Sequence, residues 1–129
     1  MKEQLISFET AKLAKEKGFG GKELTTLNGY FRGGVLCNIP CNNKSDFCHE
    51  DEFSAPTQSL LQKWLRETHQ LHLEIQVQDY VETPKFYWNI FGAYKNNKMI
   101  ICIANSPRED YVSYEEALEA GLQKALSCI

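Results

Sequence analysis

The sequence lacks several features that would place it in a membrane or on nucleic acid. No apolar run approaches the roughly 18 to 20 residues that span a bilayer, and Lys2, Glu3 and Glu9 leave no room for the apolar core of a signal peptide. A basic arm is also missing, since 14 Lys and Arg residues stand against 17 Asp and Glu residues. We therefore expect a cytoplasmic protein without membrane contact, and the charge argues against nucleic acid as its partner.

The 129 residues are 43% apolar and 24% charged, which is typical of a globular chain. A chain of this length buries about two-thirds of its unfolded surface, so one hydrophobic core is sufficient without a metal or a disulfide. We predict a single domain over residues 1–129.

The N-terminal part predicts one helix followed by irregular chain. Apolar residues at helical spacing predict a helix over residues 7–17, which Gly18 ends. Residues 19–54 are rich in glycine, proline and asparagine, which interrupt regular structure. Short strands within residues 24–31 or 35–39 are compatible with this composition.

Two amphipathic helices are expected in the remainder. The first covers residues 57–68, with Leu60, Leu61, Trp64 and Leu65 on one face. The second covers residues 114–127, because Ser113 and Glu116 have the spacing of a capping box.

Three strands are expected between these helices. Residues 71–78 alternate apolar and polar side chains, which predicts an edge strand with one buried and one exposed face. Residues 86–94 and 99–103 lack polar alternation, so both of their faces are expected to be covered, and Asn96-Asn97 predicts the turn between them. The exposed set of the first strand comprises His72, Glu74, Gln76 and Gln78.

These elements predict an α+β fold in the order α-(irregular)-α-β-β-β-α, with a three-stranded or slightly larger antiparallel sheet. Both later helices would pack on one face of the sheet, and residues 1–54 on the opposite face. Double-stranded RNA-binding domains share part of this order, but they grip phosphates with a basic cluster at the last helix. Here Glu109, Asp110, Glu115 and Glu116 occupy that place and would repel phosphate.

The cysteines offer one candidate metal site. Cys37, Cys41, Cys48 and His49 lie within 13 consecutive residues and could serve as zinc ligands. Their spacing is not that of paired C-x2-C knuckles, and the adjacent Cys48 and His49 cannot easily reach one ion. Free thiols are the favoured interpretation, and a zinc-stabilised module is the alternative.

No set of acid, base, nucleophile or metal ligand emerges from the sequence, so we predict no catalytic residue and no cofactor. The favoured function is a non-catalytic interaction module that uses the edge strand, through His72, Glu74, Gln76 and Gln78, to bind a protein partner or a second copy. The rival hypothesis is nucleic-acid binding through sheet aromatics and scattered basic residues, namely Lys63, Arg66, Lys85, Lys95 and Lys98.

Three blocks of sequence resemble a known group of proteins. These are ISFETAKLAKEKGF at residues 6–19, APTQSLLQKWLRE at residues 55–67 and SYEEALEAGLQKAL at residues 113–126, which together make up 41 of the 129 residues. In this order they resemble small uncharacterised proteins encoded by gut Bacteroidales and their phages. The resemblance implies a phage or mobile-element context and carries over no catalytic or binding residue.

Overall fold

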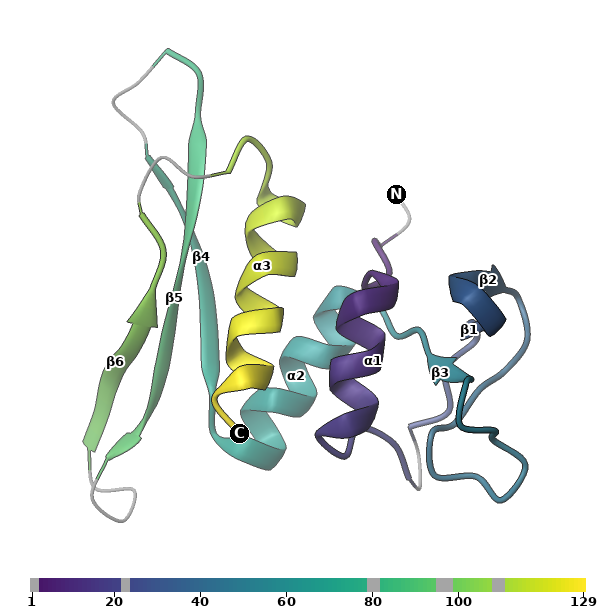
Figure 1. Cartoon of the computed structure of the whole chain (residues 1–129). Coiled ribbons are helices and arrows are strands. Elements are labelled where there is room, and N and C mark those ends of the chain that lie inside the picture. Colours follow the sequence, from purple (N-terminus) through teal and green to yellow (C-terminus); the bar gives the residue numbers. More distant parts are fainter. Residues whose placement is uncertain (1–2, 22–23, 79–81, 95–98, 108–110) are drawn as a thin grey trace. The chain divides into compact units, whose positions relative to one another are not determined.

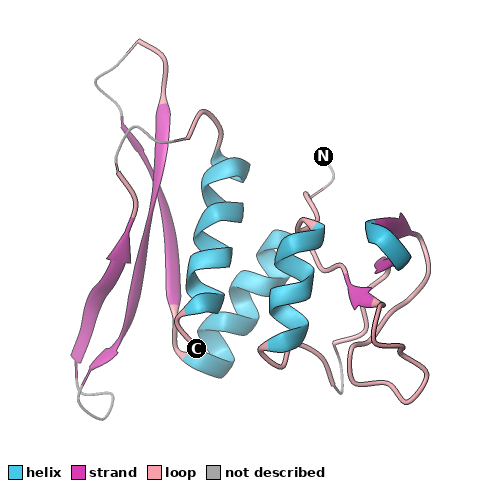
Figure 2. Ribbon diagram, in the orientation of Figure 1, coloured by secondary structure: helices cyan, strands magenta, loops and turns pink. Residues whose placement is uncertain are grey.

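The computed structural model describes residues 3–21, 24–78, 82–94, 99–107 and 111–129. Within these residues the chain forms three α-helices and two three-stranded antiparallel sheets, so the fold is α+β (Figures 1 and 2). The chain divides into two compact units, Met1–Leu60 and Leu61–Ile129, and each is described by itself. The prediction of one domain over the whole chain stays a prediction. None of the described helices is long and apolar enough to cross a bilayer.

The first unit contains one helix and a small sheet of short strands. Its strands are β1 (Gly29–Phe31), β2 (Val35–Cys37) and β3 (Phe53–Ser54), in the order β2-β1-β3, and Gly29 pairs with both Cys37 and Ser54. The first two strands lie within residues 24–31 and 35–39, where the composition is compatible with short strands, whereas the third strand was not predicted. The helix is α1 (Phe8–Glu16), and the 3-10 turn η1 (Arg32–Gly34) connects β1 to β2.

Helix α1 confirms the helix predicted over residues 7–17. Ser7 Oγ accepts a hydrogen bond from Thr10 N at 3.2 Å, which caps the first turn. Gly18, at φ 98°, then ends the helix in a conformation that favours glycine. The Phe8 ring packs 5.5 Å from the Tyr30 ring and so joins α1 to the small sheet.

Helix α2 (Gln58–His69) confirms the first amphipathic helix and contains the boundary between the two units. Thr57 Oγ1 accepts from Leu60 N at 3.2 Å at the start of the helix. Leu61, Trp64 and Leu65 are buried, as their spacing predicts.

The second unit is built on an antiparallel meander of β4 (His72–Gln78), β5 (Lys85–Tyr94) and β6 (Met99–Asn105). The strand order β4-β5-β6 confirms that residues 71–78 form an edge strand. A register shift between Ile90 and Phe91 interrupts the pairing of β5 with β6. The turn predicted at Asn96-Asn97 lies outside the described residues.

Helix α3 (Tyr114–Ser127) packs on β4 and β5, as Figure 1 shows. Ser113 Oγ accepts from Glu116 N at 3.1 Å, which confirms the predicted N-terminal cap. The helix approaches the sheet closely at Gly121. A Cβ atom there would lie 2.7 Å from Leu73 Cδ1 and 3.2 Å from Trp88 Cβ, so the contact depends on the absence of a side chain.

The expectation that both faces of β5 and β6 are covered is wrong for β6. Ile100 is 64% exposed, and Cys102 and Ile103 are exposed as well. The physical reason is the strand order: β5 occupies the centre, α3 packs on β4 and β5, and β6 forms the second edge. An apolar strand sequence therefore does not imply a strand that is buried on both faces.

The alternation predicted for β4 fails at its last two residues. Glu74 and Gln76 are exposed as predicted and His72 is half-buried, but Val77 is 47% exposed and Gln78 only 4%. Val77 pairs with Phe86, and the Phe86 ring contacts the ring of Tyr114, the first residue of α3. Val77 therefore lies near the N-terminal end of α3. Nothing in the described chain explains why Gln78 is buried.

Candidate functional site

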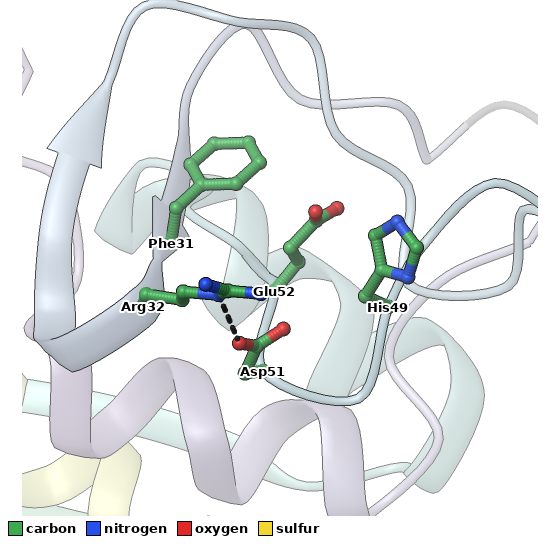
Figure 3. A pocket seen from close by; sticks show the side chains of 5 residues that line it. All are labelled: Phe31, Arg32, His49, Asp51 and Glu52. Atoms are coloured by element: carbon green, nitrogen blue, oxygen red, sulfur yellow. Dashed lines mark hydrogen bonds and ion pairs between the residues drawn. The ribbon is translucent and has the colours of Figure 1, made fainter.

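A polar hollow of about 300 Å³ lies on the surface of the first unit (Figure 3). Phe31 and Arg32 line it from the end of β1 and the turn that follows, and His49, Asp51 and Glu52 line it from the segment before β3. Arg32 Nε donates to Asp51 Oδ2 at 3.2 Å across the hollow. The hollow therefore brings together an aromatic ring, a guanidinium group, an imidazole and two carboxylates.

Lys15 of α1 holds the segment that carries His49, Asp51 and Glu52. Its Nζ donates to His49 O and to Glu52 O, both at 2.8 Å, and lies 3.7 Å from Cys48 Sγ. The carbonyl groups of two residues that are three positions apart in sequence thus accept from one ammonium group. Sequence reasoning missed this role, because a lysine in the last turn of a helix is ordinarily explained by the helix dipole.

The hollow does not contain an organised acid–base pair. Glu52 N donates to His49 O at 3.1 Å through the backbone, but within the described part of the chain no side-chain hydrogen bond or ion pair joins the His49 imidazole to the carboxylate of Asp51 or Glu52. The Arg32–Asp51 pair is open to water, since the two side chains are 92% and 51% exposed, so solvent screens it. The hollow is therefore a polar surface in which Arg32 and Asp51 form the one side-chain hydrogen bond or ion pair among its described lining residues.

The cysteines of the first unit lie in different environments. Cys37 ends β2, and Cys41 is buried and bridges to Thr26 through two backbone hydrogen bonds. Cys41 and Cys48 both line a second hollow, of about 210 Å³. Burial raises the pKa of the Cys41 thiol, and the nearby Cys48 raises it further, while a hydrogen bond with Ser54 opposes the change.

The structure does not assemble the candidate zinc ligands. Among the described residues, no group of three or more His, Cys, Asp or Glu side chains is placed to hold a metal ion. Cys37 belongs to β2 and Cys41 is buried, whereas His49 is exposed at the polar hollow. Of the four candidate ligands, Cys41 and Cys48 line one hollow, and His49 lines the other.

The predicted interaction surface lies on β4 in the second unit. Tyr87 OH donates to Gln76 Oε1 at 2.6 Å across the register that pairs the two residues. Gln62 Nε2, from α2, donates to Leu73 O at 2.8 Å. Glu74 and Gln76 are exposed on β4, as the predicted surface requires. Gln78 is buried and does not belong to that surface.

The aromatic residues of the sheet divide between its two faces. Trp88 is buried and packs against Gly121 of α3, and the Phe86 ring contacts the ring of Tyr114. Tyr87 and Phe91 are half-buried and belong to the face that also carries Gln76. Lys95 and Lys98, which the nucleic-acid hypothesis requires, lie outside the described residues, so that hypothesis stays a prediction.

Comparison with known proteins adds no function to these surfaces. No protein-family model, no curated protein and no solved structure matches the chain. Its function is therefore argued from its own side chains and strand edges.

Proposed function

We propose that the protein is a non-catalytic accessory module that associates with a second copy of itself through the edge of β4. The observation that carries this proposal is Val77, an apolar residue of an edge strand that is 47% exposed. An unpaired strand edge with an exposed apolar side chain is a template for pairing with another chain. The phage or mobile-element context that the three sequence blocks imply is consistent with an accessory role.

The available part of the edge begins after Leu73. Because Gln62 Nε2 already bonds to Leu73 O, the pairing segment is residues 74–78. Two antiparallel copies of this segment can be related by a two-fold axis at Gln76. Ile75 of each copy then faces Val77 of the other, with side chains about 4.5 to 5.5 Å apart at Cβ.

The side chains of the segment are compatible with this symmetric pairing. Val77 would lose its exposed apolar surface against Ile75 of the second copy, which is the favourable contribution. Glu74 would pair in register with Gln78, whose side chain is buried in each copy, so the two carboxylates of the dimer do not oppose each other. Gln76 would face its own counterpart, and its amide nitrogen, which takes no part in the bond from Tyr87, can donate across the axis.

The association should be weak. One five-residue strand buries much less than the roughly 1,600 Å² of a standard stable interface. We therefore expect monomers at low concentration and dimers near about 1 mM. Sedimentation equilibrium over this range should show the mass rising from 14.8 kDa towards twice that value.

Two matched lysine substitutions test the location of the contact. Val77→Lys places a charge on the β4 edge and should abolish the dimer. Ile100→Lys makes the same chemical change on β6, at the other edge, and should leave the dimer intact. A monomer at every concentration would refute the proposal, and so would a dimer that Ile100→Lys abolishes and Val77→Lys does not.

A further inference from the structure

Two cysteines of the first unit are placed to react with each other. Cys41 and Cys48 line the same hollow of about 210 Å³, and the nearby Cys48 side chain is one of the groups that raise the pKa of the Cys41 thiol. Consecutive turns connect them, since Ser45 N donates to Asn42 O and Cys48 N donates to Ser45 O, both at 3.0 Å. The backbone between the two residues is thus folded back on itself.

Neighbouring contacts hold this segment in place. The Asn43 side chain accepts from Ser54 N at 2.8 Å and donates to Phe19 O at 2.8 Å. Lys15 Nζ bonds to His49 O and Glu52 O on the other side of Cys48. Because both ends are anchored, the proximity of the two thiols is a property of the folded unit.

The two thiols differ in their surroundings. Cys48 is half-buried, and the Lys15 ammonium group lies 3.7 Å from its sulfur, where it would attract a thiolate. Cys41 is only 6% exposed, and its burial favours the protonated thiol. Cys48 is therefore the better nucleophile towards a reagent from solution, and Cys41 is the group that can react with it afterwards.

We propose that Cys41 and Cys48 form a dithiol that exchanges with low-molecular-weight disulfides, with Cys48 as the attacking thiol and Cys41 as the resolving thiol. In the first step, Cys48 Sγ loses its proton, attacks one sulfur of the small disulfide and forms a mixed disulfide, and the other half leaves as a thiol. In the second step, Cys41 Sγ loses its proton and attacks Cys48 Sγ, and the second half leaves as a thiol. The protein gives up two electrons and two protons, and one small disulfide becomes two thiols.

The test uses the full chain and glutathione disulfide. After reaction, acid quenching and blocking of free thiols with N-ethylmaleimide, peptide mass spectrometry should find a Cys41–Cys48 cross-link. Cys41→Ser should stop at glutathione bound to Cys48, because the resolving thiol is missing. Cys48→Ser should prevent the cross-link and leave Cys41 largely unmodified.

Two further variants examine the specificity of the pair. Cys37→Ser changes the third cysteine of this unit and should leave the yield of the cross-link unchanged. Lys15→Gln removes the positive charge beside Cys48 and also the bonds to His49 O and Glu52 O, so the first step should slow by at least about fivefold, the value for a unit charge about 4 Å away in water.

Several results would overturn the proposal. One is a wild-type protein that accumulates glutathione on Cys48 without forming the cross-link, and another is a cross-link that joins Cys37, Cys102 or Cys128 instead. A separate measurement needs no variant: iodoacetamide labelling of the reduced wild type should modify Cys48 before Cys41. The reverse order would contradict the assigned roles, even if a serine variant failed to fold.

Discussion

The close approach of α3 to the sheet predicts an unusual effect of Gly121→Ala. Replacing a glycine inside a helix by alanine ordinarily stabilises the folded state by about 1 kcal/mol. Here the new Cβ atom would lie 2.7 Å from Leu73 Cδ1 and 3.2 Å from Trp88 Cβ, and both residues are buried. Crowding of this kind in a packed core costs about 1 to 3 kcal/mol, so we expect a net loss of about 1 kcal/mol.

A double-mutant cycle separates the crowding from the helix propensity. Leu73→Val shortens the side chain that the new Cβ meets most closely and by itself should cost about 1 kcal/mol. In that background Gly121→Ala should change the stability by less than about 0.5 kcal/mol, because the gain in helix propensity then offsets the remaining contact.

Urea denaturation of the four proteins, followed by far-ultraviolet circular dichroism at constant m-value, measures each free energy of unfolding. If Gly121→Ala stabilised the wild-type background by about 1 kcal/mol, the helix would not lie against β4 as described, and the reasoning would be refuted.

Three other predictions concern the helix cap, the buried thiol and the surface ion pair. Ser113→Ala should lower the free energy of unfolding by about 1 kcal/mol, because Glu116 N loses the acceptor that caps α3, and urea denaturation would measure it. Burial raises the pKa of Cys41 in the folded protein above the ordinary 9.0, so the unfolded chain releases the thiol proton at lower pH. The protonated thiol therefore contributes its full share to the free energy of unfolding below about pH 9, and this share is lost as the pH rises through the pKa of the folded protein. Urea midpoints at about pH 8 and pH 10 should therefore fall more for the wild type than for Cys41→Ser, and equal falls would count against a buried thiol. Arg32→Met should change the stability by less than about 0.5 kcal/mol in the same assay, since the ion pair with Asp51 is exposed.

Periodicity and capping predicted the regular elements well because local chemistry determines them. Ser7 and Ser113 cap their helices through their own side chains, so the sequence alone contains the signal. The edge position of β4 was also predictable, because its polar residues alternate with apolar ones.

The sequence could not predict features that depend on distant partners. The exposure of Ile100 follows from the strand order, which places β6 at an edge, and no local pattern reports that order. The contacts of Lys15 with His49 O and Glu52 O join residues more than thirty positions apart. The nearness of Cys41 to Cys48 likewise depends on the turns between them, whereas cysteine spacing drew attention to a metal site that the described residues do not form.

Hydrogen exchange at the β4 edge tests the proposed association most directly. Amide exchange of residues 74–78, followed residue by residue at low and high protein concentration, reports whether this edge becomes paired. The proposal predicts that protection there rises with concentration, while protection of β6 stays constant. Exchange in β4 that is independent of concentration, or a rise confined to β6, would contradict it.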